Sequence, residues 1–136
     1  MASDDTTHER RVQQLKAIAT AFDRHELDAI MDYFADDCVF LAPRGRDAVG
    51  TRIEGKAAVR EAFAGRFAGL PDVRYTDDTH FVSGNRGASE WLLTGTTPAG
   101  ERIEVRGCDL WTFGDDKNGD QDQIVLKDSY WKIRTT

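Results

Sequence analysis

The chain has 136 residues, which suits one domain, and its composition (40% hydrophobic, 31% charged) is that of a globular protein rather than a disordered chain or a coiled coil. Its formal net charge of −6, with no basic cluster denser than Arg10-Arg11, argues against a nucleic-acid partner. No apolar run approaches the roughly 20 residues of a membrane span, and the polar, acidic start lacks the core of a signal peptide. We therefore expect a cytoplasmic protein, with no membrane contact, formed by a single domain over 1–136 in which residues 1–6 are flexible.

Apolar spacing and turn residues predict the elements in chain order. The first helix is expected to begin at a capping box, Thr6-x-x-Glu9. In order, we predict a helix over 7–24, a helix over 26–35, strands over 38–42 and 51–54, a helix over 55–67, and strands over 73–82, 88–96, 102–113 and 124–134. Because short turns join the last four strands, those strands must be antiparallel. Three helices followed by a meander predict an α+β fold, in which a curved, mostly antiparallel sheet wraps around the helices and leaves an internal pocket.

Alternation places two charged residues among apolar neighbours on the last two strands. Asp109 shares a side with Val105, Trp111 and Phe113, and Lys127 shares a side with Val125, Ser129, Trp131 and Ile133. A symmetric hairpin centred near Asn118 sets Asp109 opposite Lys127. A slip of one residue would turn every side chain to the other face, so the shared apolar faces support this arrangement.

Two chemical outcomes remain open for Asp109. If Lys127 pairs with it, both groups stay ionised. If the pocket is dry and Lys127 points away, the carboxyl can act as an acid or a base near neutrality. A buried ion pair with a purely structural role is weakly motivated energetically, because hydrophobic replacements are often as stable. We therefore assign Asp109 and Lys127 as candidate catalytic residues.

Further residues are candidates for binding a substrate. Trp111, Ser129 and Trp131 share faces with the charged pair, and Phe34 and Phe63 are expected to line the helical side of the pocket. Glu90 is a candidate second carboxylate in the pocket, and the alternative is that it is a solvated edge residue. If Glu90 faces the pocket, Trp91 faces away from it. Arg44 and Arg46 lie in a loop at the pocket mouth or in solvent. His25 and His80 are interpreted as surface or capping residues.

No sequence feature predicts a metal or an organic cofactor. Cys38 and Cys108 lack the spacing and neighbours of a zinc site, so both are interpreted as small buried hydrophobic residues, with a reactive thiol as the alternative. The turn GDDKNGDQDQ is acidic, but it lacks the glycine and the glutamate that a calcium loop places at its sixth and twelfth positions, counted from Asp116.

Several stretches resemble the nuclear transport factor 2-like superfamily, which includes ketosteroid isomerases, SnoaL-like polyketide cyclases and limonene epoxide hydrolase. They are RGCDLWTF (106–113) with QIVLKDSYW (123–131), DAIMDYFADDCVFLAP (28–43) and the helix that opens at GKAAV (55–59). The resemblance covers nearly the whole chain in element order and implies a cone-shaped, cystatin-like fold with a pocket.

The same resemblance bears on the active groups. Asp109 falls where ketosteroid isomerases hold the protonated aspartate of their oxyanion hole, but Ala42 replaces their general base and Ile18 stands near the place of their tyrosine. That mechanism is therefore disfavoured. SnoaL-like cyclases use an acid–base aspartate on a late strand, which corresponds to Asp109 or Asp128. An Arg–Asp pair as in the hydrolase would need Arg106 and Asp109 on one face, and alternation separates them.

These observations favour a SnoaL-like, cofactor-independent acid–base enzyme that acts on a small apolar carbonyl compound as an isomerase, cyclase, dehydratase or hydrolase. The alternatives are a non-catalytic small-molecule-binding domain and a protein-interaction module. In each case we expect a homodimer through the outer sheet face, which would carry Cys108, Leu110, Leu126 and Tyr130.

Overall fold

The computed structural model describes residues 2–114 and 122–135. Its elements are α1 (Ala2–Asp23), α2 (Leu27–Met31), β1 (Phe34–Leu41), β2 (Arg52–Glu54), α3 (Lys56–Gly69), β3 (Arg74–Ser83), β4 (Arg86–Thr96), β5 (Arg102–Phe113) and β6 (Ile124–Trp131). Within this part of the chain, no helix combines the length and the apolar character that crossing a membrane requires.

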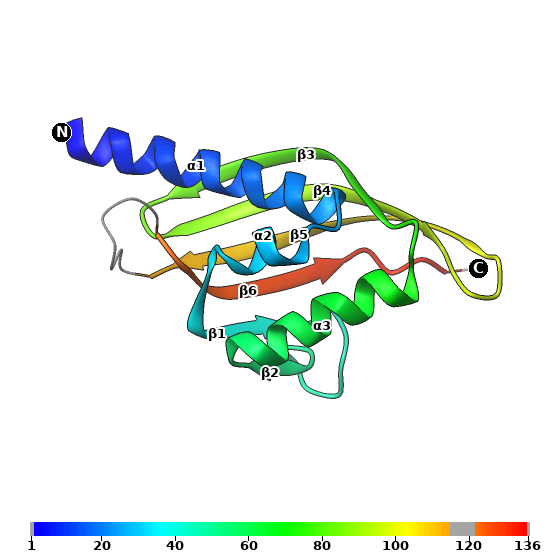
Figure 1. The fold of residues 1–136 in the computed structure, drawn as a ribbon. Helices are drawn as coiled ribbons and strands as arrows, with labels where there is room; N and C mark the ends of the chain where they lie inside the picture. The colour runs from blue at the N-terminus through cyan, green and yellow to red at the C-terminus, as the bar shows by residue number, and fades with distance from the viewer. Residues whose placement is uncertain (1, 115–121, 136) are drawn as a thin grey trace.

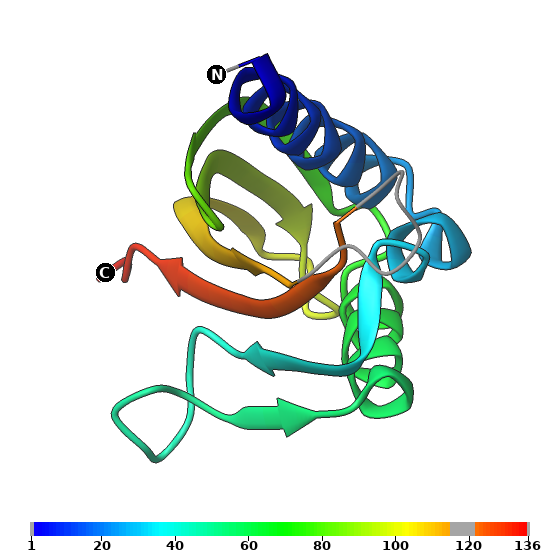
Figure 2. The ribbon, with the colours of Figure 1, turned by 90° about the vertical axis from the view of Figure 1, so that its left-hand side faces the viewer.

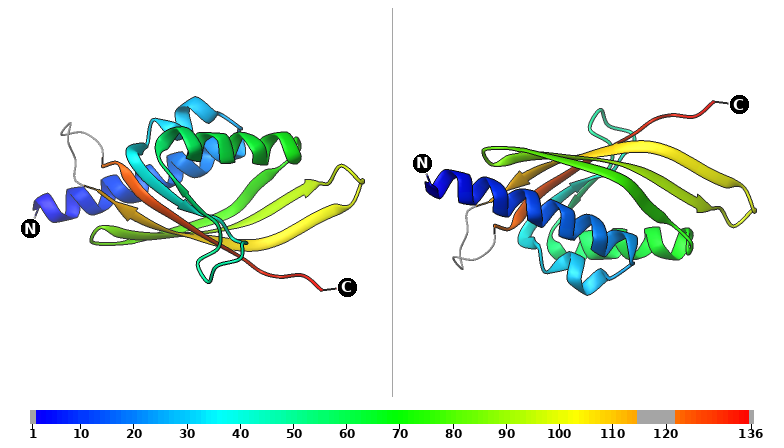
Figure 3. Two further views of the ribbon diagram at one scale, coloured as in Figure 1. Left: turned by 90° about the horizontal axis from the view of Figure 1, so that it is seen from below. Right: turned by 90° about the horizontal axis from the view of Figure 1, so that it is seen from above.

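The six strands form one sheet in the order β2-β1-β6-β5-β4-β3 (Figure 1). β1 runs parallel to β6, and every other neighbouring pair is antiparallel. The three helices lie on one side of the sheet (Figure 2), and the long strands β3, β4 and β5 bend strongly along their length (Figure 3). The predicted α+β architecture and the mixed, mostly antiparallel sheet are confirmed.

Two predicted boundaries at the N-terminal end are wrong. α1 begins at Ala2, so Thr6 lies inside the helix and does not start it. The polar first half of α1 has a buried partner instead, because Arg10 and Arg11 form ion pairs with Asp122 at 3.1 and 2.6 Å, and the Gln14 side-chain amide donates to the Asp122 carbonyl at 2.7 Å. These contacts hold the helix against the start of β6.

Phe34 belongs to β1 rather than to the second helix, which ends at Met31. Its Cα lies opposite that of Ile124 in β6, and its side chain is fully buried. A short apolar run between two elements fits a helix or a strand equally well by periodicity, and here strand pairing decides.

The register of the closing hairpin differs from the symmetric prediction. Asp109 lies opposite Ser129, and Lys127 lies opposite Trp111; the β5–β6 register also has a shift between Thr112 and Phe113. The resulting offset from the prediction is two residues, which preserves the face of every side chain. Asp109 and Lys127 are therefore diagonal neighbours on the concave face rather than direct partners.

A second irregularity bends β3. Its register against β4 shifts between Thr76 and Thr79, and Asp77 in this bulge has a φ of 52°. The Arg106 guanidinium donates to the Asp77 carboxylate at 2.9 Å. Bulges of this kind increase local twist and bend a strand. We attribute part of the curvature of β3 around α1 to it.

Candidate functional site

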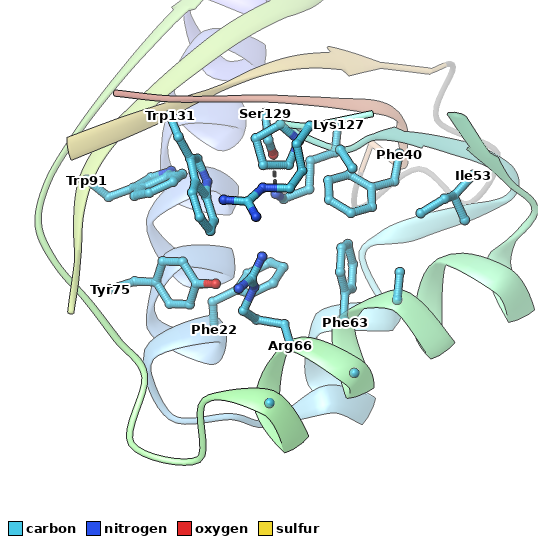
Figure 4. Close-up of a pocket in the computed structure, with 16 residues that line it drawn as sticks. Phe22, Phe40, Ile53, Phe63, Arg66, Tyr75, Trp91, Lys127, Ser129 and Trp131 are labelled. Atoms are coloured by element: carbon cyan, nitrogen blue, oxygen red, sulfur yellow. Dashed lines mark hydrogen bonds between the residues drawn. The ribbon is translucent and has the colours of Figure 1, made fainter. Parts of the chain in front are cut away.

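An aromatic pocket opens between α3, β1 and the concave face of the sheet (Figure 4). Its volume is about 340 Å³, which lies at the lower end of the range for small-molecule sites. The rings that line it are Phe22, Phe40, Phe63, Tyr75, Trp91 and Trp131. Polar groups also reach it, and among the described residues these are Arg44, Arg66, Lys127 and Ser129.

A buried hydrogen-bond network around Asp109 forms one wall of the site. Lys127 Nζ donates to Asp109 Oδ1 at 2.9 Å and to Ser129 Oγ at 2.7 Å, and the Ser129 hydroxyl donates to the same carboxylate oxygen. Trp91 Nε1 donates to Asp109 Oδ2 at 2.9 Å. The Asp109 carboxylate thus accepts from three donors, and Lys127 pairs with it rather than pointing away.

Lys127, not Asp109, faces the aromatic pocket. The Lys127 ammonium is within 4.7 Å of the Phe40 ring centroid and 5.6 Å of that of Phe63. Two of its three N–H groups bind Asp109 and Ser129, and the third has no acceptor among the described residues. Asp109 instead borders a small inner cavity of about 30 Å³ that lies behind Lys127. The site thus offers a positively charged donor to the pocket and keeps its counter-ion one layer deeper.

Gly107 explains why Trp91 can reach Asp109. Trp91 and Gly107 are cross-strand partners, and Asp109 is the next residue of β5 on the same face. A Cβ on Gly107 would lie 2.4 Å from the Trp91 ring and 2.7 Å from the Tyr130 carbonyl oxygen. The absence of a side chain at Gly107 therefore lets the indole lie flat across β5 with its N–H directed at the carboxylate.

Tyr75 supplies a second donor that faces the pocket (Figure 4). Burial raises the pKa of the Tyr75 hydroxyl strongly, and the nearby Arg66 offsets only part of this effect, so the hydroxyl stays protonated. Its backbone is held by Asp23 at the end of α1, which accepts the Tyr75 N–H at 3.0 Å. The Arg74 guanidinium beside Asp23 lowers the pKa of that carboxyl, and burial works against this.

The structure brings together most of the predicted site residues. Asp109, Lys127 and Ser129 form one network, and Phe63 and Trp131 line the aromatic pocket. Trp111 borders the inner cavity, where its Nε1 donates to Ser89 Oγ at 2.9 Å.

Two predicted binding residues are elsewhere. Phe34 is fully buried in the core behind Phe63, with 5.6 Å between the ring centroids, and does not line the pocket. Glu90 is exposed on the outer face of β4, opposite Cys108, and accepts a hydrogen bond from Thr79. The alternation in β4 was predicted correctly, but the inward set is Ser89, Trp91 and Leu93, so the expectation that Trp91 faces away is wrong.

Asp109 and Asp128 lie on opposite sides of the sheet. Asp128 lies on the outer side of β6, where the Tyr130 hydroxyl donates to it at 3.0 Å, whereas Asp109 is 5% exposed on the inner side. Arg106 is bound to Asp77, away from Asp109, in agreement with the predicted separation of Arg106 and Asp109. The hydrolase-like Arg–Asp pair is not formed.

Both histidine rings have polar partners, so neither is a free surface group. His25 has a φ of 58°, lies 2.6 Å from the Val73 carbonyl oxygen through Nε2, and stacks on Phe67. The His80 side chain is 2% exposed and lies between Asp78, at 2.6 Å, and the Ser89 hydroxyl, at 2.8 Å. Each ring has a polar partner that alternation alone does not reveal.

Neither cysteine lines the aromatic pocket. Cys38 is buried and Cys108 is partly buried on the outer face, and burial raises the pKa of both thiols, which disfavours a reactive thiolate. Most of the turn considered for calcium, residues 115–121, lies outside the described residues. Asp122, which follows it, is bound by Arg10 and Arg11.

Among the pocket groups that were not predicted as site residues are Phe40 and Tyr75 as lining residues, Trp91 as a donor to Asp109, and Arg66. A signal exists for Tyr75, which shares the inward face of its strand with the buried Val73. Arg66 on α3 carried no such signal, because helical spacing alone does not tell which polar residue borders a cavity.

Comparisons with known proteins agree with this arrangement. The model of the SnoaL-like domain matches residues 15–118. A candidate polyketide cyclase from Xanthomonas campestris pv. campestris superposes with a TM-score of 0.78 at 19% identity, over 92% of each chain. A nuclear transport factor 2-like protein of unknown function from Burkholderia pseudomallei gives 0.72 at 21% identity, over 88% of each chain.

TerC, in its co-crystal with polyporic acid, gives a TM-score of 0.71 at 16% identity, over 89% of this chain and 90% of TerC. A comparison with curated protein sequences gave no match. The likeness to the solved structures establishes the nuclear transport factor 2-like fold, and the family match spans most of the chain. The chain belongs to the SnoaL-like domain family.

Proposed function

We propose that this protein binds a small, largely apolar carbonyl compound in the aromatic pocket and that Lys127 holds the carbonyl oxygen. The observation that carries the proposal is Lys127, a pocket-lining residue that is 7% exposed, is fixed by Asp109 and Ser129, and has one N–H without an acceptor among the described residues. A fixed donor in a water-poor site stabilises negative charge on a ligand oxygen far better than a solvated lysine. The aromatic walls suit an apolar ring skeleton.

Proton transfer without a cofactor is the chemistry that this geometry supports best. Ser129 lines the pocket and donates to Asp109, so a proton taken from the carbon next to the carbonyl can pass to Ser129 Oγ while the serine proton moves to Asp109 Oδ1. The electron pair of the broken C–H bond forms an enolate, whose oxygen accepts a hydrogen bond from Lys127. The Tyr75 hydroxyl is a second donor. Isomerisation, cyclisation and elimination all proceed through such an enolate.

The family context supports a small-molecule role. A candidate polyketide cyclase shares the fold, and so does TerC, which was co-crystallised with polyporic acid. The open pocket also favours this role over a protein-interaction module, for which a cavity plugged by its own side chains is expected.

A second candidate function is binding without turnover. Two observations favour it: Asp109 does not line the pocket, and Ala42 does line it where ketosteroid isomerases carry their general base. The two functions differ in one measurable property, the exchange of ligand protons with solvent.

That exchange provides the test. Aryl and cyclic ketones such as 2-acetylnaphthalene are incubated with the protein in D₂O, and deuterium at the carbon next to the carbonyl is followed by NMR. Turnover predicts catalysed exchange that Asp109→Asn and Lys127→Met both abolish and that the exposed Lys16→Met leaves unchanged. Binding without exchange, measured by tryptophan fluorescence, selects the second function. If Lys127→Met neither weakens binding nor slows exchange, Lys127 does not hold the oxygen and the proposal fails.

A further inference from the structure

Two arginines converge on one tryptophan at the edge of the aromatic pocket. Arg44, in the loop after β1, and Arg66, in α3, both line the pocket. Their guanidinium carbons lie 5.7 and 4.7 Å from the ring centroid of Trp131 in β6. Figure 4 shows the Arg66 side chain reaching from α3 toward the middle of the pocket, near Tyr75 and Phe22.

Neither arginine has a counter-ion in the described part of the chain. Six other arginines form salt bridges with carboxylates: Arg10, Arg11, Arg52, Arg60, Arg74 and Arg106. Arg44 and Arg66 contact the indole instead, and no described Asp or Glu lines the pocket. Because Asp109 balances Lys127, the pocket keeps two uncompensated positive charges within a chain whose net charge is −6.

This arrangement suits a carboxylate. A guanidinium is planar, and its N–H groups lie in the plane, so stacking one face on an indole leaves the N–H edge free for a bidentate contact. Arg66 is half-buried and Arg44 is exposed, so two guanidinium groups attract the carboxylate together, and added salt weakens that attraction. A neutral ligand would leave both charges without a partner.

We propose that the ligand of the aromatic pocket is an acid whose carboxylate binds Arg44 and Arg66 beside Trp131, with its ring skeleton among the aromatic walls. This inference rests on the proposed function, which assigns a separate carbonyl oxygen to Lys127, and it narrows the ligand to an aromatic or cyclic keto acid.

The test compares 2-naphthoate with the neutral, nearly isosteric 2-naphthamide by calorimetry and by tryptophan fluorescence. The inference predicts that the wild type binds the acid about tenfold or more tightly than the amide. It also predicts that the ratio of the two affinities falls to about one in the double variant Arg44→Gln/Arg66→Gln. In the wild type this ratio should decrease with added salt. Arg46→Gln, in the same exposed loop but outside the pocket lining, should keep the preference. Affinity for the amide should stay the same in all these variants.

Lys127→Met separates this inference from the proposed function. The acid preference should survive that substitution, because the carboxylate is bound elsewhere. Equal affinities of the two ligands in the wild type, or a Kd of 2-naphthoate above about 1 mM, overturn the inference, and exchange of a neutral ketone can still support the proposed function. A preference that Lys127→Met removes and the arginine double variant keeps also overturns it, because the carboxylate then binds Lys127.

Discussion

Removing one partner of the ion pair between Asp109 and Lys127 should cause an unusually large loss of folding stability. Asp109 is 5% exposed and Lys127 is 7% exposed, and Lys127 Nζ lies 2.9 Å from Asp109 Oδ1. Lys127→Met leaves a buried carboxylate with two donors, Ser129 and Trp91, in place of three. Breaking a buried pair in this way costs about 3–5 kcal/mol. Asp109→Asn should have a cost of similar size, because the amide turns one donor toward Trp91 or Lys127.

The double variant, Asp109→Asn with Lys127→Met, removes both charges and should lose far less than the sum of the two single changes. We expect a coupling free energy of about 1–3 kcal/mol in a double-mutant cycle measured by urea unfolding. The exposed pair Arg60–Asp28 provides the matched control, and its cycle should give less than about 1 kcal/mol. Additivity of the Asp109 and Lys127 changes within about 0.5 kcal/mol would refute the reasoning, since independent sites behave in that way.

Three further predictions concern the support of the site, its pH dependence and the outer face. Gly107→Ala should lower the free energy of unfolding by about 1–3 kcal/mol and change the fluorescence of the displaced Trp91. An unchanged fluorescence spectrum for Gly107→Ala would contradict the packing of Trp91 against Gly107. The control is Gly65→Ala, which should be neutral or stabilising because a Cβ at Gly65 meets nothing within 4 Å. Folding lowers the pKa of Asp23 from 3.8, so Asp23 contributes its full stabilisation above pH 3.8 and loses it as the pH falls through the folded-state pKa. The difference in unfolding free energy between wild type and Asp23→Asn should therefore disappear below about pH 4. A difference that persists at lower pH would argue against the Arg74 contact. We expect a homodimer through the outer face of β5 and β6, where Tyr130 is 51% exposed. Light scattering should therefore report a dimer, and Tyr130→Glu should weaken it. A wild-type monomer at micromolar concentration would contradict this expectation.

The fold could be predicted from the sequence because its signals are local and repeated. Helical spacing identified α1 and α3, and short turns identified the meander of β3 to β6. The boundaries that failed depend on distant partners. Asp122 holds the polar start of α1, and Ile124 pairs with Phe34, and neither partner is close in sequence.

The candidate site could be predicted in part for the same reason. Alternation placed Asp109, Lys127 and Ser129 on one face, and that conclusion survives a two-residue error in register because the side-chain period is two. It could not reveal which residue meets the pocket. Lys127 lines the pocket and Asp109 lies deeper, and alternation gives only the face of a residue, not its depth. Whether Trp91 or Glu90 points inward depends on which face of β4 the helices cover. Arg66 reaches the pocket from a helix that strand alternation does not describe.

A crystal structure of the protein with bound 2-acetylnaphthalene is the most direct test of the central claim, that Lys127 carries the ligand oxygen while Asp109 holds Lys127 from behind. We predict a ketone oxygen about 3 Å from Lys127 Nζ, with the contacts from Lys127 to Asp109 and Ser129 retained. A ketone oxygen bound only by Arg66 or Tyr75, with the ammonium turned away from the pocket, would contradict the claim.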